Sequence, residues 1–178
     1  MPDQRRRVRR VTTSARNRDR VPGRLRDDGA VPHVRAATPA DVDALLALWA
    51  VAAENDARPT DSADAVRRLL TRDPEACLVA EQAEAADEAG RLLGSVIAGW
   101  DGWRAHLYRL AVHPDARRCG IGSLLVDAAT ARLVALGASR IDAMVLEHND
   151  LGQTIWRAAG YARQDDWRRW VRPTAGPR

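Results

Sequence analysis

The sequence contains no lysine and no phenylalanine, and only two of its 178 residues are cysteines. The absence of lysine excludes a phosphate-binding loop of the type that ends in Gly-Lys-Ser or Gly-Lys-Thr. Cys77 and Cys119 form no Cys-x-x-Cys pair, and no histidine cluster has metal-ligand spacing, so we predict neither a disulfide framework nor a metal site. These cysteines fit a reducing, cytoplasmic environment. No apolar run approaches the roughly 18 residues that span a bilayer, so no membrane association is expected.

Positive charge is concentrated at the N-terminus. Residues 1–32 carry ten arginines and four aspartates, a net charge of +6, although the whole chain carries only +4. The rest of the chain therefore has a net charge of −2 and offers no excess of positive charge to nucleic acid. Because residues 1–32 have few large apolar side chains, we predict a disordered, arginine-rich extension. The alternative is an arm that contacts nucleic acid by charge alone.

Hydrophobic periodicity predicts one α+β domain over residues 33–173, followed by a short C-terminal tail over 174–178. The order contains one strand-helix-strand crossover and no internal repeat. Helices are expected over residues 39–53, 63–72, 121–136 and 151–159, and strands over 33–38, 76–83, 91–100, 104–112 and 139–147, with a last strand or hairpin over 161–171.

The stretch VHPDARRCGIGSLL, at residues 112–125, lies between a predicted strand and a predicted helix. Gly120 and Gly122 leave the start of that helix without bulky side chains, and unpaired N–H groups there attract anions. Arg117 and Arg118 add two donors for phosphate oxygens. The Gly-x-Gly spacing alone is explained equally well by a tightly packed helix start. A dinucleotide-binding fingerprint is not supported because its third glycine is missing.

The spacing Arg-x-x-Gly-x-Gly, which begins at Arg117, resembles the acyl-CoA signature of the GNAT N-acetyltransferases. Asn149 follows the next predicted strand, and Gly160-Tyr161 stands where the family usually has Gly-Phe. The sequence is identified as a member of this superfamily over about residues 34–171. The resemblance implies a GNAT fold, with a central mixed, mostly antiparallel sheet that is splayed between two parallel strands and flanked by about four helices.

The resemblance also implies acetyl-CoA as cosubstrate and no metal. In this family the main chain of one splayed strand binds the pantetheine arm, and loop amides hold the pyrophosphate. Trp156 is expected beside the arm, or alternatively in the core. The matching positions are Leu110, Ala111 and Val112 on the strand, Arg117, Arg118, Cys119, Gly120, Ile121, Gly122 and Ser123 in the loop, and Asn149 and Trp156 beside the arm.

The residues that the family commonly uses for proton transfer are missing. The usual tyrosine acid is replaced by Trp156, and the usual glutamate base by Met144 or, in histone-type members, by His106. We predict His106 as the general base, because an imidazole exchanges protons near neutral pH. Tyr108 is a second catalytic candidate, as acid or substrate contact. Alternatively, both side chains are structural. Alternation places every second residue from His106 to Val112 on one face, unless a bulge intervenes.

The predicted function is N-acetyltransfer from acetyl-CoA directly to a primary amine of a small molecule or of a peptide or protein terminus. Glu54, Asp56 and Glu147 are expected to attract a cationic acceptor, although polar loop residues are ordinarily just solvated. One alternative is a catalytically weak acyl-CoA-binding GNAT module, because the usual tyrosine and glutamate are absent. Another is a nucleic-acid-associated protein that acts through its arginine-rich arm. Homodimer formation is left open.

Overall fold

The computed structural model of the chain describes residues 32–52, 61–82, 91–172 and 174. The predicted acceptor residues Glu54 and Asp56 lie outside the described residues. The same holds for almost all of the predicted N-terminal extension and C-terminal tail.

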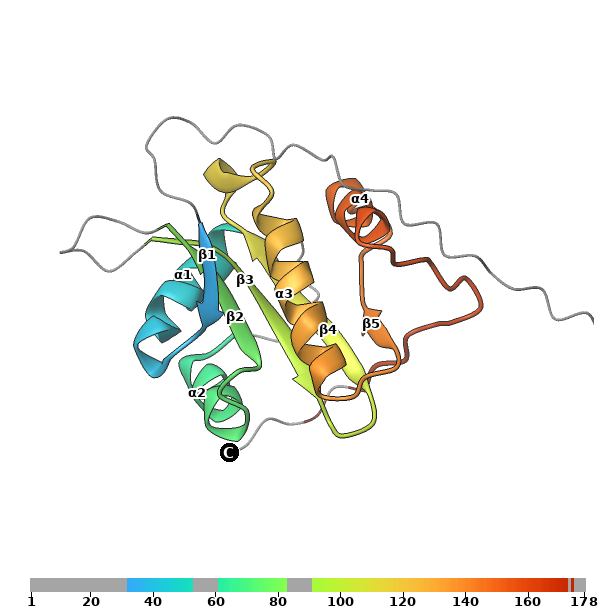
Figure 1. Cartoon of the computed structure of the whole chain (residues 1–178), viewed down its shortest axis with the longest axis horizontal. Helices are drawn as coiled ribbons and strands as arrows, with labels where there is room; N and C mark the ends of the chain where they lie inside the picture. Colours follow the sequence, from blue (N-terminus) through green and yellow to red (C-terminus); the bar gives the residue numbers. More distant parts are fainter. Residues whose placement is uncertain (1–31, 53–60, 83–90, 173, 175–178) are drawn as a thin grey trace, which may run out of the picture.

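A five-stranded sheet forms the centre of the molecule (Figure 1), with its strands in the order of the sequence. All neighbouring strands are antiparallel except the last two, β4 and β5, which are parallel. A crossover helix makes that parallel pairing feasible. The strands are β1 (His33–Ala36), β2 (Cys77–Glu81), β3 (Leu92–Trp100), β4 (Ala105–Val112) and β5 (Ile141–Ala143).

Four α-helices cover the sheet in the described part of the chain (Figure 1). None of the described helices is long and apolar enough to cross a membrane. Two short 3-10 turns precede α1 and α3, at Pro39–Asp41 and Pro114–Ala116. The helices are α1 (Val42–Val51), α2 (Ala63–Arg72), α3 (Ile121–Ala135) and α4 (Asp150–Ala158).

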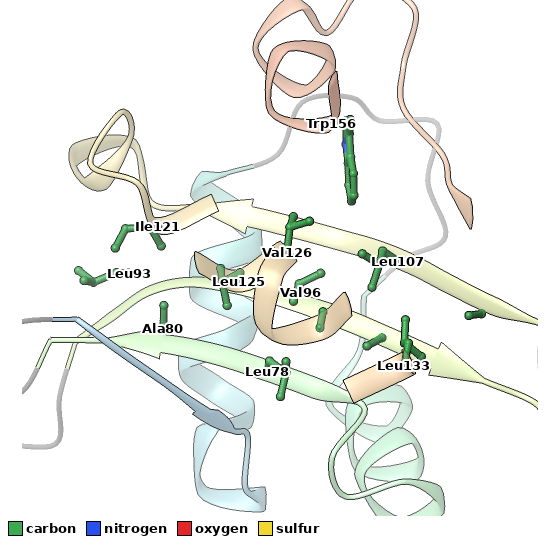
Figure 2. Close-up of a cluster of buried hydrophobic side chains, with 13 residues drawn as sticks. Leu78, Ala80, Leu93, Val96, Leu107, Ile121, Leu125, Val126, Leu133 and Trp156 are labelled. Atoms are coloured by element: carbon green, nitrogen blue, oxygen red, sulfur yellow. The ribbon is translucent and has the colours of Figure 1, made fainter. Parts of the chain in front are cut away.

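Two apolar clusters lie on opposite faces of the sheet, because successive side chains of a strand point to opposite sides. Leu78 and Ala80 of β2 pack toward α3, whereas Cys77 and Val79 pack toward α1 and α2. Figure 2 shows the first cluster, in which Trp156 extends from α4 toward β4. The face under α3 and α4 is therefore closed by apolar side chains.

An ion-pair network joins β1 to the start of α1 at the edge of the sheet opposite β5. Arg35 donates two hydrogen bonds to the Asp41 carboxylate, both at 2.8 Å, and a third to Glu81 Oε2 at 2.7 Å. The Arg35 guanidinium lowers the pKa of Asp41 to about 2, and the Thr38 N–H and hydroxyl support the same carboxylate. This network fixes the β1 edge.

The predicted strand or hairpin over residues 161–171 is wrong, because the structure has no strand between residues 161 and 172. The strand predicted over 139–147 is shorter than expected and contains only the three residues of β5. So short an edge strand offers little backbone for another ladder. An ion pair between Arg163 and Glu147, at 3.3 Å, links the segment after α4 to the segment after β5 instead.

Candidate functional site

The ladder between β4 and β5 ends halfway along β4. Its pairs are Ala105 with Ile141, His106 with Asp142, and Leu107 with Ala143. Beyond Leu107, β4 continues to pair with β3 on its other side, while the chain after Ala143 leaves the strand conformation. Main-chain groups of residues 108–112 that face away from β3 are therefore not engaged by β5. Backbone groups in this position need another partner.

A β-bulge interrupts β4 directly after this point. The β3–β4 register changes from Ile97 opposite Tyr108 to Ser95 opposite Ala111, so β4 contains one residue more than β3. Arg109 adopts a φ of 56°, in the left-handed region. A bulge of this kind bends the strand and redirects its side chains.

The bulge overturns the expected alternation along β4. Leu110 and Val112 pack against the cluster under α3, as does Leu107, whereas Ala111 packs against the opposite cluster. His106 and Tyr108 alternate with buried Leu107 and therefore lie on the α1 and α2 face. The prediction that His106 and Tyr108 share a face with Leu110 and Val112 is wrong, because the extra residue inverts the order.

The loop before α3 places a glycine where the backbone requires one. Gly120 has a φ of 83°, and a Cβ built there would meet nothing within 4 Å. Conformation rather than lack of space therefore demands glycine, and the surroundings are open to a ligand. Gly122 serves packing instead, because its Cβ would lie 3.1 Å from Ile155 of α4. Together they bring an uncovered helix start close to α4 and β4.

The loop is braced from the side of β3. Arg91 Nη2 donates to Asp115 at 3.1 Å and lies 3.0 Å from His113 Nδ1. Arg117 Nε donates to the Val112 carbonyl at 3.4 Å, which holds this guanidinium at the end of β4. Arg118 is exposed. The first N–H groups of α3 have no acceptor within the helix, so an anion there would satisfy them.

Asn149 caps the start of helix α4, and its Oδ1 accepts a hydrogen bond from Gly152 N at 2.6 Å. Trp156 is buried against Leu107 and its neighbours, and its ring meets Tyr161 edge-on at 4.9 Å. The Tyr161 hydroxyl is buried and has no hydrogen-bond partner among the described residues. Trp156 is therefore part of the apolar core, and its indole ring cannot serve as a proton donor to a thiolate.

The opposite face of β4 is polar and partly open. His106 is exposed, and Tyr108 retains 43% of its accessible surface. Burial of the remainder raises the pKa of the Tyr108 phenol, and the nearby Cys77 and Asp73 add to this effect. The phenol is therefore protonated at neutral pH and able to donate a proton. The predicted acceptor residue Glu147 lies at the surface and pairs with Arg163.

Sequence reasoning missed Arg109 and its neighbours on this face. The Arg109 guanidinium forms an ion pair with Asp61 and lies 4.9 Å from the ring centre of Trp49. The only sequence feature that could have indicated Arg109 was the presence of an arginine among the apolar residues of LYRLAV, at residues 107–112. Nothing in a single sequence shows that this arginine stands at a bulge.

The loop before α3 and the end of β4 have features that suit acetyl-CoA. The described residues contain no group of three or more histidine, cysteine or acidic side chains that could hold a metal ion. In contrast, the left-handed Gly120 opens a helix start at the end of β4, the strand whose ladder is incomplete. A diphosphate at the helix start and an extended arm along β4 suit these two features.

Comparisons with known proteins agree with this architecture. The profile described as the Acetyltransferase (GNAT) family matches residues 42–161. Acetyltransferase YE1169 from Yersinia enterocolitica is 37% identical over 100 residues, 56% of this chain and 67% of that protein. The solved structure of Ard1 from Thermoplasma volcanium superposes with a TM-score of 0.63 at 19% identity, over 74% of this chain and 82% of Ard1. The NatC complex bound to Gag peptide and CoA gives a TM-score of 0.61 at 17% identity, over 75% of this chain and 86% of the matched chain.

The chain therefore belongs to the GNAT acetyltransferase family. The predicted α+β fold, a mixed and mostly antiparallel sheet with two parallel strands and four flanking helices, is confirmed. GNAT acetyltransferases take their acetyl group from acetyl-CoA, so acetyl transfer is the class of activity that this fold supports.

Proposed function

We propose that this protein is an N-acetyltransferase that moves an acetyl group from acetyl-CoA directly to a primary amine of a small molecule or of a peptide or protein terminus. The observation that carries the proposal is the incomplete β4–β5 ladder, which ends at Leu107 and leaves the rest of β4, up to Val112 next to Gly122 at the start of α3, without a β5 partner. We assign this activity to residues 33–173, with residues 1–32 and 174–178 outside the catalytic domain.

The cofactor would be held largely by the main chain. Leu110, Ala111 and Val112 follow the last residue that pairs with β5, so those of their main-chain groups that face away from β3 suit the amides of the pantetheine arm, except the Val112 carbonyl, which accepts from Arg117 Nε. The N–H groups of residues 118–123 suit the pyrophosphate, because the positive end of the α3 dipole favours negative charge. Asn149, at the start of α4, and Trp156, which is buried against β4, are our candidates for the α4 side of this path. Cys119 is partly exposed within the same loop.

The acetyl transfer itself requires an unprotonated amine nitrogen to attack the thioester carbonyl, after which the C–S bond breaks and the thiolate takes a proton. His106 is our candidate for the group that accepts the amine proton, directly or through water. Tyr108 is our candidate for the group that protonates the thiolate, since its raised pKa keeps the phenol protonated. The two side chains lie two residues apart on the open face of β4.

The acceptor is expected to reach the thioester from this open face, because α3 and α4 close the other one. The solved NatC relative is bound to a peptide together with CoA, which supports a peptide amine as one acceptor class. Glu147, with Glu54 and Asp56 from the connection between α1 and α2, would attract an acceptor that carries a positive charge.

The decisive experiment measures release of free CoA thiol from acetyl-CoA over a panel of small amines and peptides with free N-termini. We expect turnover with at least one acceptor class, and the acetylated nitrogen can be identified by mass spectrometry. Binding of acetyl-CoA without turnover on any amine would instead support a catalytically weak acyl-CoA-binding module, a candidate favoured by Trp156 at the usual tyrosine position.

A further inference from the structure

Arg109 points away from the face that regular alternation would give it. Residue 109 would share the face of Leu107, beneath α3, if β4 were a regular strand. Because of the bulge and the left-handed φ of 56°, its guanidinium lies instead over Trp49 of α1 on the opposite side of the sheet. Bulges redirect side chains in this way and occur preferentially beside active sites.

Arg109 belongs to an interlocked set of side chains from three elements. Its Cζ lies 4.9 Å from the Trp49 ring centre, a cation–π distance. The Trp49 Nε1–H donates to Ser95 Oγ at 2.8 Å, and both of these side chains are buried. Ser95 stands directly opposite Ala111, the residue that ends the bulge. The contacts therefore run from Ser95 in the sheet through the Trp49 ring to the Arg109 guanidinium, which is the outermost of the three.

The same guanidinium holds the beginning of α2. Its Nη2 forms an ion pair with Asp61, which directly precedes Ser62, the residue that caps α2. The side chains of Arg109 and Asp61 are 21% and 23% exposed. Such partly desolvated charges interact more strongly than an ion pair in open water. Arg109 therefore connects the β4 bulge with α1 through Trp49 and with α2 through Asp61.

We propose that Arg109 is a positioning residue for the acceptor. It follows Tyr108 on the open face of β4, two residues after the β4–β5 ladder ends, where an acceptor must approach the thioester. By fixing α1 and the start of α2 at the bulge, Arg109 determines how well the acceptor binds, and leaves acetyl-CoA binding unaffected. This inference rests on the proposed function, since it specifies how that same site receives its amine.

The test compares the full-length wild type with Arg109→Gln on an acceptor identified from the amine panel. We expect the KM of the acceptor to rise about tenfold, whereas kcat changes by less than about threefold and the Kd of acetyl-CoA by less than about twofold. Asp61→Asn should have a similar effect. The double variant should be no worse than either single one, because both substitutions break the same ion pair.

An exchanged pair, Asp61→Arg with Arg109→Asp, tests whether the contact itself matters. Aspartate tolerates a positive φ better than most residues, so this variant should recover at least about half of the lost kcat/KM for the acceptor. Arg35→Gln is the matched control, because Arg35 also bridges two elements through ion pairs but lies on the β1 edge. It should lower Tm and leave the acceptor KM unchanged.

The inference is wrong if Arg109→Gln behaves like Arg35→Gln, with a lower Tm and an unchanged acceptor KM. It is also wrong if the Kd of acetyl-CoA rises as much as the KM of the acceptor. A wild-type protein that binds acetyl-CoA and acetylates no amine is a different outcome. That result would overturn the proposed function and, with it, any acceptor role, before a variant is compared.

Discussion

The two faces of β4 differ in nearly every physical respect. Toward α3, the strand presents Leu107, Leu110 and Val112 to an apolar cluster. Toward α1 and α2, it presents His106, Tyr108, Arg109 and Ala111, of which the first two are exposed. The first face is closed by packing, and the second is open, polar and shaped by ion pairs. One bulge within this strand of eight residues changes which residues belong to each face.

The comparison shows how the two faces of one strand can have different tasks. The closed face holds α3 and α4 in place and keeps the start of α3 next to Ile155 and Val112. The open face leaves polar side chains where a second substrate can arrive. Substitutions at the α3 loop should therefore change acetyl-CoA binding, while substitutions on the open face should change the acceptor or the chemistry.

The largest effect is expected from Gly120→Glu. A carboxylate at the start of α3 would repel a pyrophosphate, and glutamate also disfavours the φ of 83°. The Kd of acetyl-CoA, measured by calorimetry, should rise at least about 100-fold. Gly137→Glu is the control, because Gly137 also has a positive φ and open surroundings but lies at the far end of α3. Equal losses in both variants would show that backbone strain alone matters.

His106→Ala should lower kcat by about 10²-fold if His106 accepts the amine proton, with little change in acetyl-CoA binding. The acidic limb of kcat/KM against pH should also change, because a base must be unprotonated to act. His33→Ala, on the β1 edge, is the matched control. A wild-type rate and pH profile in His106→Ala would assign this imidazole a structural role only.

Arg35→Gln should lower stability without affecting either substrate, because it lies far from both faces of β4. The pKa of Asp41 is lowered in the folded state from 3.8 to about 2, so its ion pair stabilises the fold above pH 4. That contribution is lost as the pH falls from about 4 to 2. We expect a loss of about 1–2 kcal/mol at pH 7, allowing for the 32% exposure of the Arg35 side chain.

Urea unfolding of the wild type and Arg35→Gln at pH 7 and pH 3 checks this prediction. The difference between the two proteins should shrink at pH 3, because Asp41 is then largely protonated in the unfolded chain and folding of the wild type must release that proton. A difference that is independent of pH would mean that the guanidinium stabilises the β1 edge by packing.

The smallest effect is expected from Glu147→Gln, in the segment that follows β5. Glu147 is largely exposed and shares its charge with Arg163, so water weakens its attraction for an acceptor. The KM of a cationic acceptor should rise about two- to threefold, with no change for a neutral one. Steady-state kinetics with both acceptor types make the measurement. A tenfold effect would place the acceptor much closer to Glu147 than to Arg109.

Local sequence signals predicted most elements because each has a short-range cause. Helix α2 is found at the predicted residues, since Ser62 caps it and Asp73-Pro74 ends it. The glycine spacing before α3 also predicted a helix start, and α3 begins at Ile121 directly after Gly120. The final strand over 161–171 was wrong because strand formation depends on a partner, and β5 is too short to provide one.

The sequence by itself determined the family and most of the order of the elements, and it predicted an acyl-CoA loop, because these depend on spacing and on backbone preferences of neighbouring residues. Only the tertiary structure decided how β4 divides its side chains between two faces. The extra residue of the bulge becomes visible only in the register with β3, and it moves Arg109 to Trp49 and Asp61. A bulge of one residue inverts the alternation on which any sequence-based assignment of faces depends.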